Sequence, residues 1–252
     1  MLYPVKTFTT KKIIWGVLTP LIWLLIWQII SLKVNSEVLV PAPLTVFNRL
    51  AFLAKTSAFW LAVGRSVLRI FLGLAFGVVL GVIFACLCRI FAANRLLSPV
   101  KTVIKATPVV SFIMLAWIWL KRDSIPVFIS MLIVIPVVWQ NAETGISGVD
   151  KKLKEFARAY GLTGFKAIKH IYIPSVKPYF TSALCTSAGL VWKAGVAAEV
   201  LCQPKNSIGA NLYNAKNILE TADVFAWTAV VIIISVILEK AIGYAVKNDK
   251  SK

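Results

Sequence analysis

Two ionisable side chains, those of Lys193 and Glu199, lie within the apolar run Tyr179–Val200. A charged group at membrane depth is costly unless it faces a water-filled cavity or a partner, so such residues often mark a solute path. Glu199 follows Trp192 by seven residues and shares its helix face, whereas Lys193 is turned about 100° away from Trp192. We interpret Trp192 and Glu199 as lining a path and Lys193 as attracting an anionic solute. The alternative is that both charges lie near the outer interface and extend to water.

A second candidate region is the basic stretch from Lys154 to Pro178, which separates two apolar runs. Apolar residues recur at its start with the spacing of one helix face. These residues are Leu153, Phe156, Ala157 and Tyr160. Gly161 follows, and glycine in the left-handed conformation is a common helix stop. The pattern predicts a short helix that ends at this glycine.

A second short helix is predicted directly after the first. Thr163 can cap its start, and Pro174 and Pro178 would end it and lead into the next apolar run. Its apolar face would consist of Phe165, Ile168 and Tyr172. The whole stretch is then a helix–Gly–helix element, apolar on one side and basic on the other. By pattern alone it also fits amphipathic helices that lie on an anionic leaflet.

The composition places these candidates in a membrane protein. Of the 252 residues, 59% are hydrophobic and 15% are charged, and the formal net charge is +18. This apolar content exceeds that of soluble domains. The basic residues fall between apolar runs and form no separate domain, so nucleic acid is not an expected partner. The chain has a single His and no zinc-ligand spacing among Cys86, Cys88, Cys185 and Cys202, so neither a metal site nor a cofactor is expected.

We predict an all-α polytopic membrane protein with about six transmembrane helices. The expected spans are Ile13–Ile30, Ile70–Leu87, Lys101–Leu120, Ile125–Ala142, Tyr179–Val200 and Val224–Val246. Each approaches the length that a bilayer requires. Pro108 and Pro136 can kink the third and fourth of these spans.

The loop charges predict an orientation. With the N-terminus inside, the inner segments hold 18 Lys and Arg residues and the outer segments hold 10. The positive-inside rule therefore favours two cytoplasmic termini. We divide the chain into a cytoplasmic arm 1–12, a transmembrane domain 13–246 that contains a cytoplasmic loop 143–177, and a cytoplasmic tail 247–252.

One outer segment and one glycine series carry further structural signals. The outer segment Lys33–Trp60 contains VPAPLTVFNRLAFLA, which predicts a short interfacial helix after its two prolines. In the second span, Gly73, Gly77 and Gly81 recur every four residues and leave a groove for another helix backbone. We interpret them as packing residues within one subunit, and a contact between two copies is the alternative.

The loop resembles the coupling loop of the permeases of ATP-binding-cassette importers. That loop typically reads Glu-Ala-Ala-x-x-x-Gly, a spacer, and then Ile-x-Leu-Pro. The matching residues here are Glu155, Ala157, Gly161, Ile171 and Pro174. The chain departs from this pattern at Phe156, where Ala is usual, and at Ile173, where Leu is usual. Both replacements are apolar.

The resemblance extends over most of the chain, to the nitrate, sulfonate and taurine branch of these permeases. The similar segments are VPAPLTVFNRL, SVLRIFLGLAFGVVLGV, GLVWKAGVAAEVL and DVFAW. The branch also includes carriers of bicarbonate, thiamine precursors and flavins. Glu199 matches its AAE pattern, whereas Lys193 stands where an apolar residue is usual.

The resemblance implies a permease subunit of a bacterial inner-membrane importer that moves a small anionic or heteroaromatic solute. Its implied partners are a second permease copy, two cytoplasmic ATPase subunits, an extracytoplasmic solute-binding protein and membrane lipid. Glu155, Ala157 and Gly161 would shape the helix that docks on the ATPase. The chain lacks a G-x-x-x-x-G-K-[ST] phosphate loop, so another subunit would hydrolyse ATP and this chain would not be an enzyme. The alternative is a membrane scaffold whose basic loop binds lipid or a regulatory partner.

Overall fold

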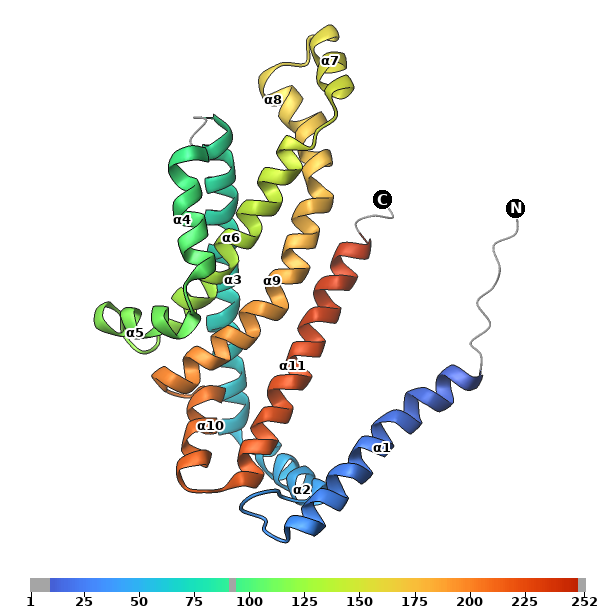
Figure 1. The fold of residues 1–252 in the computed structure, drawn as a ribbon, viewed down its shortest axis with the longest axis vertical. Helices are drawn as coiled ribbons and strands as arrows, with labels where there is room; N and C mark the ends of the chain where they lie inside the picture. The colour runs from blue at the N-terminus through green and yellow to red at the C-terminus, as the bar shows by residue number, and fades with distance from the viewer. Residues whose placement is uncertain (1–9, 91–93, 249–252) are drawn as a thin grey trace.

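The computed structural model describes residues 10–90 and 94–248, and all regular elements in these ranges are helices (Figure 1). The chain order is α1 (Thr10–Val34), α2 (Pro43–Ala54), α3 (Ser57–Ile90), α4 (Asn94–Ala106), α5 (Val109–Trp119), α6 (Ile125–Ser147), α7 (Lys151–Ala159), α8 (Gly164–Ala167), a π-helical segment (Ile168–Tyr172), α9 (Ile173–Cys202), α10 (Ile208–Asn217) and α11 (Thr221–Asn248). Most of the predicted arm 1–12 and tail 247–252 lies outside the described residues.

Four helical stretches are long and apolar enough to cross a membrane, and they coincide with four of the predicted spans. They are Ser57–Arg89, Ile125–Ser147, Gly164–Cys202 and Thr221–Tyr244. In α1, the stretch Leu18–Val34 is apolar but shorter than these four. The second span was predicted to be centred on Ile70–Leu87, and its helix begins more than two turns earlier, at Ser57.

The third predicted span is not one helix. Its two parts, Leu96–Ala106 and Val109–Trp119, meet at an angle of 102°. Pro108 causes the break because proline has no backbone N–H to donate and disfavours helical geometry at the residue before it. The next helix starts from the same residue, since the backbone N–H of Ser111 donates to the carbonyl of Pro108. The proline was predicted to kink this span, and the structure shows a sharper turn that sends α5 away from the bundle (Figure 1).

The prediction that Pro174 and Pro178 end the second loop helix is wrong. The chain remains helical from α8 through the π-helical segment and along all of α9. Pro174 lies in the first turn of α9, where the wider π turn precedes it, and Pro178 lies inside the helix. The loop is therefore joined to a membrane helix without a flexible connection.

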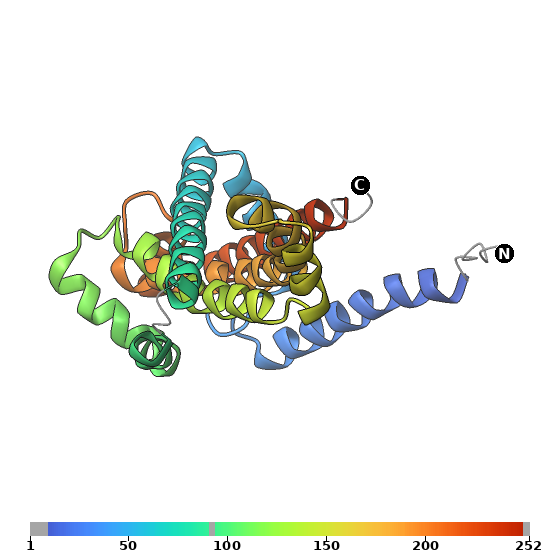
Figure 2. The ribbon, with the colours of Figure 1, turned by 90° about the horizontal axis from the view of Figure 1, so that it is seen from above.

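The helix α6 forms the centre of the bundle, with α3 packed along one side and α9 along the other (Figures 1 and 2). Gly73, Gly77 and Gly81 face α6 of the same chain, which is the packing that the glycine spacing predicted. A Cβ atom added at these three positions would lie 2.4, 2.6 and 2.8 Å from the Cβ atoms of Ser130, Val134 and Val138. The glycines let the two backbones approach closely, as in other small-residue contacts between membrane helices.

The end of the bundle opposite α7 is closed by α2, α10 and the start of α11. A short helix was predicted after the two prolines, and α2 begins there; its Val46 is buried, whereas Leu44, Phe47 and Phe52 are exposed. Its position at a membrane interface remains a prediction. The indole N–H of Trp27 in α1 donates to the carbonyl of Pro41 over 3.0 Å. From this anchor, α1 leads away from the bundle (Figure 2).

Replacing Gly77 with Ala should destabilise the protein, because the new methyl group would lie 2.8 Å from the backbone oxygen of Met131. Overpacking of this kind costs about 1–3 kcal/mol, and a lower thermal unfolding midpoint in detergent measures it. The matched control is Gly64→Ala on the same helix, where a Cβ meets nothing within 4 Å. Equal midpoints for the two variants would contradict the tight α3–α6 contact.

Candidate functional site

The first part of the candidate site is the loop between α6 and α9. Asp150 caps α7, since its Oδ1 accepts a hydrogen bond from the backbone N–H of Lys152 at 3.0 Å. After α7 ends, Gly161 adopts the predicted left-handed conformation with φ +62°. The N–H of Leu162 then donates to the carbonyl of Ala157 at 2.8 Å, which closes the helix end. Thr163 precedes α8 in extended conformation, but its side chain makes no capping hydrogen bond.

Ala157 and Ile171 hold the loop together. With Val149 they form a small buried cluster, and Leu162 and Tyr172 pack against it. This cluster joins α7 to the π-helical segment that continues into α9. Pro174 begins α9 directly after that segment. Three of the residues in the coupling-loop pattern, Ala157, Gly161 and Ile171, therefore determine the shape of one compact element.

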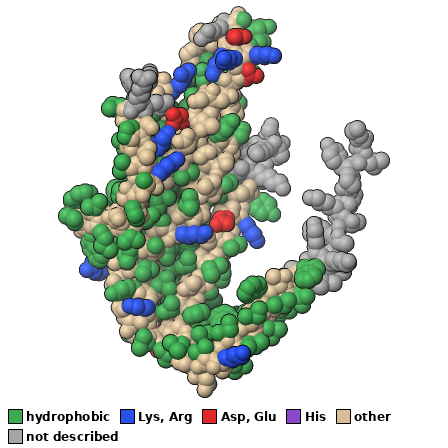
Figure 3. Space-filling view, viewed as in Figure 1, with side chains coloured by type: hydrophobic (Ala, Val, Ile, Leu, Met, Phe, Trp, Pro, Cys, Tyr) green, Lys and Arg blue, Asp and Glu red, His purple; other side chains and the backbone are tan. Residues whose placement is uncertain are grey.

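The rest of the predicted apolar face points outward. Glu155 is exposed beside it, and the exposed apolar residues are Leu153, Phe156, Tyr160, Phe165 and Ile168. The rings of Phe156 and Tyr160 lie 4.3 Å apart. In the space-filling view, this end of the molecule mixes apolar, basic and acidic side chains (Figure 3). Exposed apolar surface rimmed by charges is typical of a protein interaction site.

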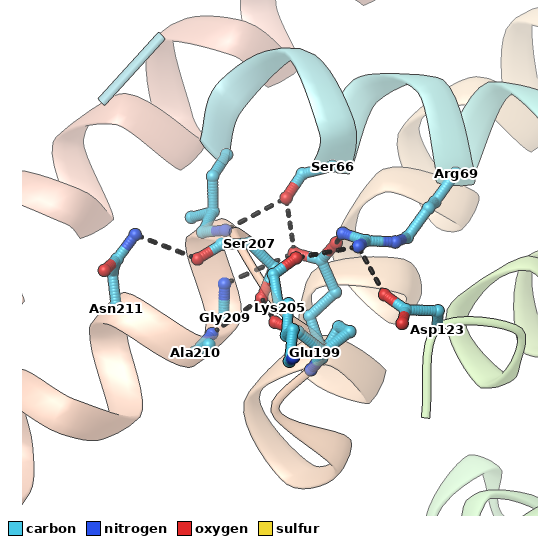
Figure 4. A network of polar contacts seen from close by, with 11 residues as sticks. Ser66, Arg69, Asp123, Glu199, Lys205, Ser207, Gly209, Ala210 and Asn211 are labelled. Atoms are coloured by element: carbon cyan, nitrogen blue, oxygen red, sulfur yellow. Dashed lines mark hydrogen bonds and ion pairs between the residues drawn. The ribbon is translucent and has the colours of Figure 1, made fainter. Parts of the chain in front are cut away.

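The second part of the site is a polar network around Glu199 (Figure 4). The carboxylate is fully buried. It accepts hydrogen bonds from the Ser66 hydroxyl at 2.6 Å and from the Gly209 backbone N–H at 3.3 Å, and it lies 3.4 Å from the guanidinium of Arg69. These partners come from α3 and α10. The network therefore joins three helices at membrane depth, where an unpaired carboxylate would be strongly unfavourable.

Glu199 also accepts a hydrogen bond from a backbone N–H group at the start of α10. The first helical N–H groups of α10 have no partner within the helix. The N–H of Ile208 donates to Ser66 Oγ at 2.9 Å, and that of Ala210 donates to Ser207 Oγ at 3.0 Å. The N–H of Gly209 donates to the carboxylate, whose negative charge is favoured at a helix N-terminus. A Cβ at Gly209 would lie 2.4 Å from the Cβ of Glu199, so only glycine allows this approach.

Arg69 extends the network to two loops. Its Nη2 donates to Asp123, before α6, at 2.6 Å and to the carbonyl of Lys205, before α10, at 2.8 Å. The Arg69 side chain is 11% exposed and that of Asp123 is 59% exposed. One guanidinium thus links a buried carboxylate to an exposed one, and it holds the connections before α6 and α10 against α3.

The structure separates the three residues that were predicted to line a path. Trp192 is fully buried, and its indole N–H donates to the carbonyl of Val231 in α11 at 2.9 Å. Glu199 lies in the network described above. Lys193 is exposed, and it lines a pocket of about 320 Å³ between the α4–α5 bend, α6 and α9. Lys105 lines the same pocket. The path-lining roles of the three residues remain predictions.

Ser66, Arg69 and Gly209 were not predicted from the sequence as partners of Glu199. A signal was available: Ser66 and Arg69 are three residues apart, so they share a helix face. For the α9–α10 connection, nothing in the sequence shows which charge it would meet.

Replacing Arg69 with Met should lower the thermal unfolding midpoint in detergent, because Glu199 would lose its opposite charge while remaining buried. Breaking a buried ion pair from one side costs about 3–5 kcal/mol, and the longer 3.4 Å contact favours the lower end. Arg65→Met, at an exposed position of the same helix, is the control and should leave the midpoint nearly unchanged. If both variants unfold alike, Arg69 does not stabilise the network.

Known proteins resemble this chain in sequence and in fold. One relative is the putative aliphatic sulfonates transport permease protein SsuC of Bacillus subtilis (strain 168). It is 27% identical to this chain over 215 residues, which cover 84% of this chain and 77% of SsuC. The taurine transport system permease protein TauC of Escherichia coli (strain K12) is 24% identical over 221 residues, which cover 84% of this chain and 80% of TauC.

A solved structure shows the same fold. The match is to a chain of the bacterial alginate ABC transporter in complex with alginate pentasaccharide-bound periplasmic protein. The TM-score is 0.60 and the sequence identity is 16%. It covers 95% of this chain and 96% of that chain. Residues 77–246, more than half of the sequence, match the family described as binding-protein-dependent transport system inner membrane component. The chain belongs to this family, and it is a multi-pass transmembrane permease subunit of an ABC importer and not itself an enzyme.

Proposed function

We propose that this permease imports a small organic anion, with a sulfonate as the first candidate, and that a separate ATPase drives the import through the α7 loop. The observation that carries the proposal is the loop itself. It is stiffened internally by Ala157 and Ile171, and it presents an exposed apolar face next to Glu155. A rigid element with such a surface is better suited to bind a partner protein than to serve as a flexible linker between two helices.

The proposed arrangement has both termini and the α7 loop in the cytoplasm. The excess of Lys and Arg in the inner segments supports this orientation. Two copies of the permease form the path, two ATPase subunits bind the two loops, and a solute-binding protein delivers the solute at the opposite end. The family description names binding-protein dependence, and the alginate transporter of the same fold is bound to a periplasmic protein.

The helix α9 provides the mechanical link in this proposal. Its start is continuous with the loop, and Glu199 near its far end is tied to α3 and α10. When the ATPases close, the loop shifts as a rigid body and α9 moves with it. The two move together because the helical backbone between them is unbroken. The linked connections before α6 and α10 then shift with it, and the outer end of the path changes shape.

Lys193 supports the anionic substrate class. It is exposed on α9 and lines the 320 Å³ pocket at the α4–α5 bend, close to the size of a small organic solute site. Lys105 lines the same pocket, so two basic residues contribute to its wall. The relatives are named for aliphatic sulfonates and for taurine, and both kinds of solute carry a sulfonate group that is anionic at neutral pH.

The loop leads to a test of coupling. Gly161→Val should separate ATP hydrolysis from uptake in proteoliposomes, because a β-branched residue is strained at φ +62° and would distort the end of α7. Gly161→Asn is the matched control, since Asn tolerates the left-handed conformation. We expect uptake per ATP to fall severalfold in the Val variant and to stay near wild type in the Asn variant. Normal coupling in both would rule out this role for the loop.

Co-purification from membranes separates the importer from the scaffold alternative. Wild-type permease should retain the cognate ATPase, and a Glu155→Arg, Gly161→Val double variant should lose it. If folded wild-type permease retains no ATPase, the result contradicts the importer proposal. It then favours the alternative of a membrane scaffold whose basic loop binds lipid or a regulatory partner.

Lys193 leads to a test of substrate charge. Lys193→Gln should raise the KM for uptake of an aliphatic sulfonate about tenfold, because one charge-assisted hydrogen bond contributes about 1.5–3 kcal/mol. Lys193→Arg should largely preserve KM. Lys216→Gln, an exposed lysine of α10, controls for the loss of one positive charge elsewhere. An unchanged KM in Lys193→Gln would exclude a contact with the anion.

A further inference from the structure

A partly buried ion pair joins α4 to α6. The ammonium of Lys101 donates a hydrogen bond to Glu143 Oε2 at 2.7 Å, and the two side chains are 14% and 21% exposed. The same ammonium lies 5.1 Å from the centroid of the ring of Trp139, which is buried. A carboxylate and an aromatic face both attract a cation, so Lys101 is held from two sides.

The pair lies beside the pocket of Lys193, on the side nearer to α7. Lys105 follows Lys101 by four residues, so it lies one turn further along the same face of α4, and it lines the pocket. On α6, Pro136 lines the pocket and precedes Glu143 by seven residues, which is about two turns on one face. Neither Lys101 nor Glu143 lines the pocket itself.

Two lysines of α4 are therefore neighbours of one carboxylate. Side chains four residues apart on a helix have Cβ atoms about 5–6 Å apart, and lysine has a flexible four-carbon stem, so Glu143 is within reach of Lys105 as well as Lys101. In the structure Glu143 pairs with Lys101, which has the additional contact with Trp139. Lys105 is exposed and makes no ion pair within the described part of the chain.

The ion pair is not required merely to hold α4 against α6. Leu97 already packs α4 against a buried cluster that contains Cys88 and Trp139. Apolar residues of similar volume often hold two helices as firmly as a partly buried ion pair, because burial removes the charges from water. The distinctive effect of the pair is that it decides which lysine neutralises Glu143.

We propose that Lys101 is a positioning residue for the pocket of Lys193. By pairing with Glu143, it leaves the ammonium of Lys105 free to bind an anionic solute together with Lys193. Lys105 is then a second residue that determines specificity for anions. This assignment rests on the proposed function, which places the solute in that pocket.

The test measures uptake of ethanesulfonate by the complete transporter in proteoliposomes. Lys105→Gln should raise KM about tenfold, as expected for Lys193→Gln, because each removes one charge-assisted hydrogen bond. Lys101→Met should raise KM about threefold, because Glu143 would then attract Lys105 away from the pocket without removing it. Its kcat should stay near wild type, since the loop and α9 are unaltered. Lys101→Arg should preserve KM.

A double variant separates this role from simple helix packing. In Lys101→Met, Glu143→Gln the competing carboxylate is absent, so Lys105 should remain available and KM should return to near the wild-type value. If the pair only holds the helices together, the double variant should be impaired at least as much as Lys101→Met. Lys216→Met, at an exposed lysine of α10, controls for the loss of one positive charge elsewhere. Thermal unfolding midpoints check that each variant folds.

Two results would overturn the proposal: an unchanged KM in Lys105→Gln, or no recovery of KM in the double variant. Lys105 is exposed, so its variant decides the first point even where Lys101→Met does not fold. Lys193→Gln separates this failure from that of the proposed function. A raised KM in Lys193→Gln with an unchanged KM in Lys105→Gln leaves the solute pocket in place and removes only the role of α4. An unchanged KM in both variants removes the anion pocket as well.

Discussion

The buried carboxylate of Glu199 is the constraint on which the end of this permease opposite α7 depends. A carboxylate inside the membrane must be surrounded by donors or it destabilises the fold. Here the donors are a hydroxyl, the start of a helix and a guanidinium, supplied by Ser66, Gly209 and Arg69. This requirement brings α3, α9 and α10 to one point. It also explains Gly209, because any side chain there would collide with the backbone of α9.

The same helix that carries Glu199 begins at the loop, so the two parts of the candidate site are mechanically related. The loop is held to α9 by the Ala157 and Ile171 cluster, and no extended segment interrupts the backbone between Gly164 and Cys202. At the centre, close contact between α3 and α6 comes from three glycines and gives the bundle a rigid axis. By contrast, the α4–α5 bend has fewer restraints, and it borders the pocket of Lys193.

Sequence reasoning predicted the local features well where a single residue determines the backbone. Gly161 was expected to be left-handed and is, and the four-residue glycine spacing identified the helix face that meets α6. It was wrong where the effect of a proline depends on its surroundings. Pro108 was expected to kink its span and the helix does break there, whereas Pro174 and Pro178, which were expected to end a helix, lie within a continuous one after a π turn. It also missed the partners of Glu199, since Ser66 and Arg69 are 133 and 130 residues away in the chain.

The contrast between Glu199 and Lys193 shows how one helix can use two charges differently. They are six residues apart on α9, and no ion pair joins them among the described residues. The charge of Glu199 is satisfied within the subunit, so its primary effect is to hold helices together. Lys193 is exposed at a pocket that a second lysine also lines. A charge that the protein leaves accessible at membrane depth retains its capacity to attract an ion of opposite sign. For this reason, the anion binding that we propose for the permease is better sought at Lys193 than at the more completely bonded Glu199.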